Sequence, residues 1–214
     1  YLDGATNEPI TAATVIDGFT ITAGNATETW SDREGGGLYC AGIDSSDAGR
    51  ECSPALANIT FSGNRARLYG GGMYNDGSTG GKSSPALTNV TFSGNTAQLY
   101  GGGMFNDGND VRLTNVTFTN NSTAIRNNGN LYLLNTIVAG STAGSNYNCS
   151  GMIDKFYSLG HNLDSGNSCN FTHLGDLVNT DSLPSPLGDY HGPTPTHTLL
   201  PHNPTISTGT THHS

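Results

Sequence analysis

A 25-residue segment occurs twice with little change, and this repetition restricts the fold more than any other feature of the chain. Residues 53–77 read SPALANITFSGNRARLYGGGMYNDG, and residues 84–108 read SPALTNVTFSGNTAQLYGGGMFNDG. The two copies start 31 residues apart and share 20 of 25 positions. Shortened copies begin at positions 113 and 133, and a diverged copy spans 15–25. Repetition with a period of 20–35 residues predicts a stack of similar structural units.

Apolar residues alternate with a period of two inside each copy, as in Ile59/Phe61 and Val90/Phe92. This period is typical of strands, and no segment shows sustained helical periodicity. A unit of three short strands and three turns needs roughly 20–30 residues. We therefore predict an all-β fold, a right-handed parallel β-helix (solenoid) of about six coils with an extended C-terminal segment.

Aligning the copies predicts ladders of like residues that form one continuous interior. Four ladders are expected, namely Phe61/Phe92/Phe118/Val138, Ile59/Val90/Val116, Leu56/Leu87/Leu113/Leu133 and Leu38/Met73/Met104/Ile125.

The glycine triplets 70–72 and 101–103 fit tight turns and close approach between coils. A phosphate-binding loop is the alternative, but neither a GK[ST] motif nor a helix follows either triplet. We expect Asn75-Asp76-Gly77 and Asn106-Asp107-Gly108 to form turns, because these residue types tolerate left-handed conformations.

The net charge of −9, with only eight Lys and Arg residues, argues against a nucleic-acid partner. No apolar run is long enough to span a membrane. The chain begins at Tyr1, which suggests a mature or trimmed product. No site for a cofactor or a metal is expected.

Four cysteines fall into two local pairs, Cys40 with Cys52 and Cys149 with Cys169. Local pairing predicts two disulfides and an extracellular or cell-surface location. A metal site is the alternative, but there is no CxxC motif and no histidine at ligand spacing. The first disulfide would staple the loop 41–51.

The C-terminal part carries longer motifs, NTIVAGSTAGSNYNCSG (135–151), SLGHNLDSGNSC (158–169) and GDLVNTDSLPSPLGDYHGPTPTHTLLPHNP (175–204). Together with the repeats, these motifs resemble secreted bacterial choice-of-anchor Q and polymorphic outer-membrane-type repeat proteins of the pectate-lyase-like superfamily, over about residues 10–206. Ser182 and His191 depart from the usual pattern of that family. The resemblance implies a secreted, structural or adhesive role and no defined catalytic activity.

We expect no catalytic residues. Arg65 and Arg67 lie together, but no carboxylate cluster faces them, so a solvated edge is favoured over a lyase base. The motif Asn179-Thr180-Asp181 is like part of a hydrolase site, but its partner motifs are missing. Asp76 and Asp107 should stack, either as a Ca²⁺ site or, as we favour, as plain turn residues.

The sequence contains eight N-x-S/T sequons, which are candidates for glycosylation, at Asn25, Asn58, Asn89, Asn115, Asn120, Asn121, Asn148 and Asn170. The alternative is composition, because Asn and Thr are abundant in β-helix turns. In particular, Asn58, Asn89 and Asn115 should align as a turn ladder.

We divide the chain into a β-helix with irregular last coils (1–181) and a proline-rich extended tail (182–214), which should run along the solenoid or reach a neighbour. Uncapped coil ends favour a non-catalytic extracellular scaffold, adhesin or filament subunit that binds copies of itself end to end. The alternative is a carbohydrate-binding or polysaccharide-degrading β-helix with glycans as partners. An exposed aromatic row of Tyr69, Tyr74, Tyr100 and Phe105 would favour that alternative.

Overall fold

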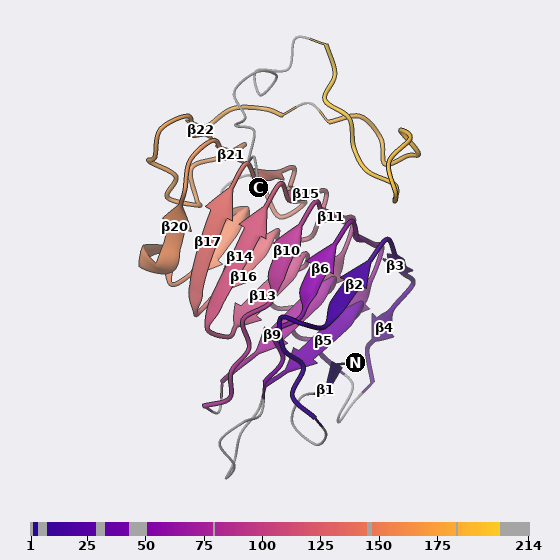
Figure 1. Ribbon diagram of the computed structural model, residues 1–214. Helices are drawn as coiled ribbons and strands as arrows, with labels where there is room; N and C mark the ends of the chain where they lie inside the picture. The colour runs from indigo at the N-terminus through magenta and orange to yellow at the C-terminus, as the bar shows by residue number, and fades with distance from the viewer. Residues whose placement is uncertain are drawn as a thin grey trace.

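The computed structural model describes residues 2–3, 8–28, 33–42, 51–78, 80–144, 147–182 and 184–201. The strands are two to five residues long, and a short 3-10 helix, η2, spans Ile153–Lys155. Every pairing between the named strands is parallel. The expected all-β class is therefore confirmed, in the form of stacked parallel sheets (Figure 1).

Four sheets run along the stack, and we number them 1 to 4. In order, sheet 1 contains β1 (Leu2–Asp3), β5 (Leu38–Ala41), β9 (Met73–Asp76), β13 (Met104–Asp107), β16 (Ile125–Asn127) and β19 (Cys149–Gly151). Sheet 2 contains β2 (Val15–Asp17), β6 (Ala55–Ala57), β10 (Ala86–Thr88), β14 (Asp110–Thr114), β17 (Asn130–Leu134) and β20 (Phe156–Ser158).

Sheet 3 contains β3 (Thr20–Thr22), β7 (Thr60–Ser62), β11 (Thr91–Ser93), β15 (Thr117–Thr119), β18 (Ile137–Ala139), β21 (Leu163–Asp164) and β22 (Leu177–Val178). The short sheet 4 contains β4 (Asn25–Ala26), β8 (Arg65–Ala66) and β12 (Thr96–Ala97). The chain visits sheets 2, 3 and 1 in the same order again and again, and we call each such passage a level. The first level begins at β2, the second at β6 and the third at β10.

The predicted interior ladders are present. Strand register pairs Phe92 with Phe61 and with Phe118, and it pairs Phe118 with Val138. The phenyl rings of Phe92 and Phe118 stack with centroids 4.6 Å apart and an angle of 2° between their planes. Register likewise confirms the leucine ladder of sheet 2 and the Leu38–Met73–Met104–Ile125 ladder of sheet 1. Nearly all of these side chains are almost completely buried, so stacked levels share one apolar core.

The glycine triplets have the structural role that the sequence predicts. Gly70 and Gly101 adopt φ angles of 64° and 65°, in the left-handed region that glycine enters without penalty. A Cβ atom on Gly71 would lie 2.4 Å from the carbonyl oxygen of Thr96 on the next level. The levels therefore approach too closely here for any side chain.

The prediction that Asn75-Asp76-Gly77 and Asn106-Asp107-Gly108 form turns is wrong for the first two residues of each. Asn75 and Asp76 lie within β9, and Asn106 and Asp107 lie within β13. The reason is that the Asn75 and Asn106 amides bond to each other across the levels inside the core. Left-handed asparagines occur instead at the corner between sheets 2 and 3, at Asn58, Asn89, Asn115 and Asn135.

The described part of the tail is folded back on itself, which differs from the extended course expected for it. Isolated antiparallel bridges join Pro184 to Leu199 and Gly188 to Thr196. Residues 202–214 lie outside the described part of the chain. We call residues 184–201 the strap.

Candidate functional surfaces

Two asparagine ladders run through the interior and explain much of the polar composition. In one ladder, the buried Asn64, Asn95 and Asn121 side chains are linked, with Nδ2 of Asn95 donating to Oδ1 of Asn121 at 3.0 Å. In the other, Nδ2 of Asn75 donates to Oδ1 of Asn106, and Nδ2 of Asn106 donates to Oδ1 of Asn127, both at 2.8 Å. These buried amides hydrogen-bond to one another and to nearby carbonyl groups, so they stabilise the stack and cannot bind a ligand.

Both predicted disulfides are present, with Cys40 bonded to Cys52 and Cys149 to Cys169. The register pairs Cys40 with Asn75, so the cysteine takes the ladder position of that asparagine. Most of the loop between Cys40 and Cys52, residues 43–50, lies outside the described part of the chain. Two disulfides indicate an oxidising, extracellular environment.

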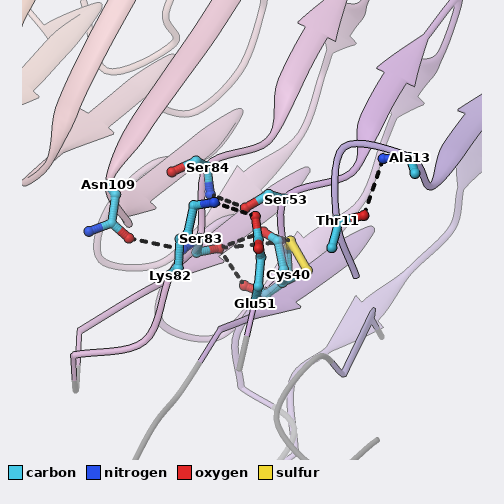
Figure 2. A network of polar contacts seen from close by, with 10 residues as sticks. Thr11, Ala13, Cys40, Glu51, Ser53, Lys82, Ser83, Ser84 and Asn109 are labelled. Atoms are coloured by element: carbon cyan, nitrogen blue, oxygen red, sulfur yellow. Dashed lines mark hydrogen bonds and ion pairs between the residues drawn. A yellow bond between two sulfur atoms is a disulfide. The ribbon is translucent and has the colours of Figure 1, made fainter. Parts of the chain in front are cut away.

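Polar contacts surround the first disulfide (Figure 2). The Ser83 hydroxyl lies within bonding distance of the Cys52 carbonyl oxygen, at 3.1 Å. On the surface, Lys82 Nζ lies 2.7 Å from Glu51 Oε1. The hydrogen bond from Lys82 holds the pKa of Glu51 below its ordinary value, although partial burial acts in the opposite direction.

An aromatic cluster covers the outer face of sheet 1. Tyr39 and Tyr74 stack at 5.2 Å, and Tyr69 stacks on Phe105 at 4.9 Å and on Tyr100 at 6.1 Å. Tyr69, Tyr74, Tyr100 and Phe105 therefore do gather in one cluster. However, Tyr74 and Phe105 are only 5% exposed, because Tyr69 packs against both, while Tyr100 is 44% exposed. The cluster packs mainly against itself and offers little open aromatic surface.

Carboxylates border this aromatic cluster. The Tyr39 hydroxyl donates to Oδ2 of Asp76 at 2.6 Å, and burial together with this bond raises the pKa of Tyr39 far above its ordinary value. Burial, followed by repulsion from Asp76, raises the pKa of Glu34, although Arg33 acts in the opposite direction. Asp76 and Asp107 are register partners, as expected.

The bonding of Asp76 fits a structural role. One carboxylate oxygen accepts from Tyr39 and the other from the backbone and hydroxyl of Ser78, at 3.0 and 2.7 Å. Among the described residues, no group of three or more His, Cys, Asp or Glu side chains is placed to hold a metal ion. The expectation that Asp76 and Asp107 are turn residues is wrong, because they are the last residues of the strands β9 and β13.

The other residues singled out in the sequence are dispersed. Arg65 is exposed in β8, and Arg67 follows that strand. Asn179 is exposed after β22 with φ 52°.

The sequon asparagines differ in their accessibility. Asn121 and Asn148 are fully buried, and Nδ2 of Asn148 donates to Asp164 at 2.7 Å, so neither amide is open to modification in the folded chain. Asn58, Asn89 and Asn115 form the predicted outer ladder. Asn25, Asn120 and Asn170 are exposed, and they remain candidates for glycosylation.

The first level leaves the interior open. Phe19 stands in register with Ile59, since Thr60 N donates to Phe19 O at 3.0 Å and Thr91 N donates in the same way to Ile59 O. Ile59 is 0% exposed, whereas Phe19 is 58% exposed. Ile16 and Ile21 are also only half-buried, although their partners Leu56 and Phe61 are buried. Leu2 and Ile10 pack against the core from the described N-terminal residues, but they leave Phe19 exposed.

The strap lies against the outer face of sheet 3 through polar contacts. The Thr194 hydroxyl donates to the Asn58 carbonyl at 3.2 Å, and the hydroxyls of Thr91 and Thr196 lie 3.1 Å apart. Thr60 bonds to the carbonyl of Pro195, and Nε2 of His197 lies 3.0 Å from the Ser93 hydroxyl. The sequence predicts that the tail runs along the solenoid, but it does not predict which face the tail meets. The one signal for this face is the row of outward Thr and Ser residues on sheet 3.

Searches against protein families, curated proteins and solved structures find no match to this chain. Within the described residues, no helix is long and apolar enough to cross a membrane.

Proposed function

We propose that the stacked sheets form a right-handed parallel β-helix and that the protein is a secreted, non-catalytic structural protein. Support for the architecture comes from the repeated visits to sheets 2, 3 and 1 and from the in-register ladders. Crossovers between parallel strands of one sheet are almost always right-handed. The resemblance to secreted bacterial repeat proteins of the pectate-lyase-like superfamily is part of the same proposal.

The structural role is a scaffold, adhesin or filament subunit that assembles end to end. The observation that carries this proposal is the open end of the interior at the first level. Three inward ladders end there on Ile16, Phe19 and Ile21, which remain partly exposed. The strands β2, β3 and β4 also have one unpaired edge each among the described residues. An edge of this kind is a template for strand addition.

The polar side chains inside the molecule give further support. The internal asparagines are used in ladders, and the bordering carboxylates accept bonds from neighbouring residues. The aromatic cluster is largely buried by its own members, so it stabilises sheet 1 more than it provides a sugar platform. A scaffold needs these features, whereas a catalytic surface needs converging groups with free bonding capacity.

The test measures the assembly of the 214-residue chain by sedimentation velocity over a range of concentrations and by electron microscopy. We expect association that rises with concentration and linear particles. Phe19→Lys should abolish it, because a charge would replace the apolar end of a ladder. Leu99→Lys is the matched control, since Leu99 is 50% exposed but lies between β12 and β13 in the middle of the stack. A chain that stays monomeric at all concentrations would refute the proposal.

A further inference from the structure

A polar groove lies where the strap meets the corner between sheets 2 and 3. Its volume is about 290 Å³, and it is lined by Asn58, Asn89, Thr91, Asn115, Thr117, Gly192, Pro193, Thr194 and Thr196. The floor therefore comes from the outer asparagine ladder and the first residues of β11 and β15. The far wall comes from the strap, a segment more than 70 residues later in the sequence.

The floor holds amides in a regular row. Nδ2 of Asn89 donates to Oδ1 of Asn58 at 3.3 Å, and Nδ2 of Asn115 donates to Oδ1 of Asn89 at 3.1 Å. Nδ2 of Asn135 continues the row by donating to Oδ1 of Asn115 at 3.1 Å. An amide has two N–H donors and two lone pairs on its oxygen. Each of Asn89 and Asn115 thus keeps one donor and one acceptor for a ligand.

The backbone fixes these amides in place. Asn58, Asn89 and Asn115 adopt φ angles of 51°, 55° and 54°, so the same left-handed corner recurs at each level. Successive levels are separated by the usual strand spacing of about 4.8 Å. The floor is therefore a rigid, repeating set of donor and acceptor pairs, which limits the entropy lost on binding.

Other lining residues add a hydroxyl group and an apolar ring to the amide row. The Thr117 hydroxyl borders the groove, and Pro193 is an exposed apolar ring in the strap. None of the lining side chains carries a charge. A ligand for this groove needs many hydroxyl groups for the amide row, apolar C–H surface for the proline ring, and no net charge.

We propose that this groove is a binding site for a neutral oligosaccharide, which runs along the amide row beside the strap. This site goes beyond the scaffold function, and its failure would leave the assembly of the chain unaffected. It is also separate from the aromatic cluster, which lies on sheet 1.

The experiment is isothermal titration of the full chain with a panel of neutral oligosaccharides. The protein is produced in bacteria, and its intact mass is measured to exclude a glycan attached to the sequon asparagines of the groove. We expect at least one neutral oligosaccharide to bind, and Asn89→Gly to weaken its binding about tenfold through loss of the amide contacts. Thr117→Val should weaken it about fivefold through loss of one hydroxyl.

Asn135→Gly is the matched control, because Asn135 has the same left-handed conformation (φ 51°) and a ladder bond, but it does not line the groove. It should bind nearly as well as the unmodified chain. Glycine is used at both positions since it accepts positive φ, so folding is preserved, and circular dichroism checks this. The proposal is overturned if no neutral oligosaccharide binds at millimolar concentration. It is equally overturned if Asn89→Gly and Thr117→Val bind normally while Tyr100→Ala loses binding, which would place the ligand on the aromatic cluster.

Discussion

Replacing Asn95 by alanine tests how much the internal ladders contribute to stability. The Asn95 side chain is 0% exposed and makes four hydrogen bonds. Its Nδ2 donates to the Phe61 carbonyl at 2.9 Å and to Oδ1 of Asn121 at 3.0 Å. Its Oδ1 accepts from the backbone and the side-chain nitrogen of Asn64, both at 3.0 Å.

The magnitude follows from these bonds. Each hydrogen bond contributes about 1 kcal/mol net, and a buried partner left without one costs about 1–3 kcal/mol. We therefore expect Asn95→Ala to lower the free energy of unfolding by at least about 4 kcal/mol. The control is Asn130→Ala, which removes one exposed bond to Asp110 of 2.8 Å and should cost less than about 1 kcal/mol.

The assay is equilibrium unfolding in guanidinium chloride with the disulfides intact, followed by circular dichroism. The slope of the transition should not change, because both variants bury the same surface. If Asn95→Ala and Asn130→Ala shifted the midpoint equally, the internal ladder would contribute no more than a surface bond, and the reasoning would be refuted.

Three further predictions concern ionisable groups and cross-links. The pKa of Glu34 is raised on folding, so its negative charge opposes folding once the pH exceeds the unfolded pKa of about 4.3. Glu34→Gln should therefore raise the Tm at neutral pH. This gain in Tm should disappear below pH about 4. The pKa of Glu51 is lowered on folding, so its contribution to stability is present above the unfolded pKa and is lost as the pH falls through the folded pKa. Glu51→Gln should therefore lower the Tm slightly at neutral pH but not in acid. An equal change in Tm at both pH values would contradict the role of Lys82. Replacing Cys149 and Cys169 with serine opens a loop with a sequence separation of 20 and should lower the free energy of unfolding, measured with denaturant, by about 3 kcal/mol. An unchanged midpoint would show that the disulfide does not constrain the unfolded chain.

The internal repeats were enough to predict the strands and their parallel pairing partners, and the local spacing of the cysteines was enough to predict both disulfides. Register could be read from the sequence because like residues recur at one position of each copy, as with Phe61, Phe92 and Phe118. A one-residue slip would move each phenylalanine from the core to the solvent, so the pattern admits only one alignment.

The asparagines could not be placed from the repeats and the turn propensity alone. The same residue type occupies the left-handed corner at Asn89, the buried ladder at Asn95 and strand β13 at Asn106. Composition and turn propensity treat these positions alike, and they therefore predict a turn at Asn106. The core decides among them, since an amide inside the stack must find its partners on the levels above and below.

The sequence by itself determined the stacking, because each ladder depends on neighbours at a fixed spacing along the chain. The contacts of the strap and of the aromatic cluster, in contrast, were decided only by the tertiary structure. The strap reaches Thr60 and Asn58 across 135 and 136 residues, respectively, through hydroxyl and carbonyl groups that the repeats do not pair with the tail. The burial of Tyr74 and Phe105 likewise depends on how Tyr69 packs against them. Local repetition fixes contacts between adjacent levels, whereas polar and aromatic contacts at the surface arise only once the folded levels bring distant segments together.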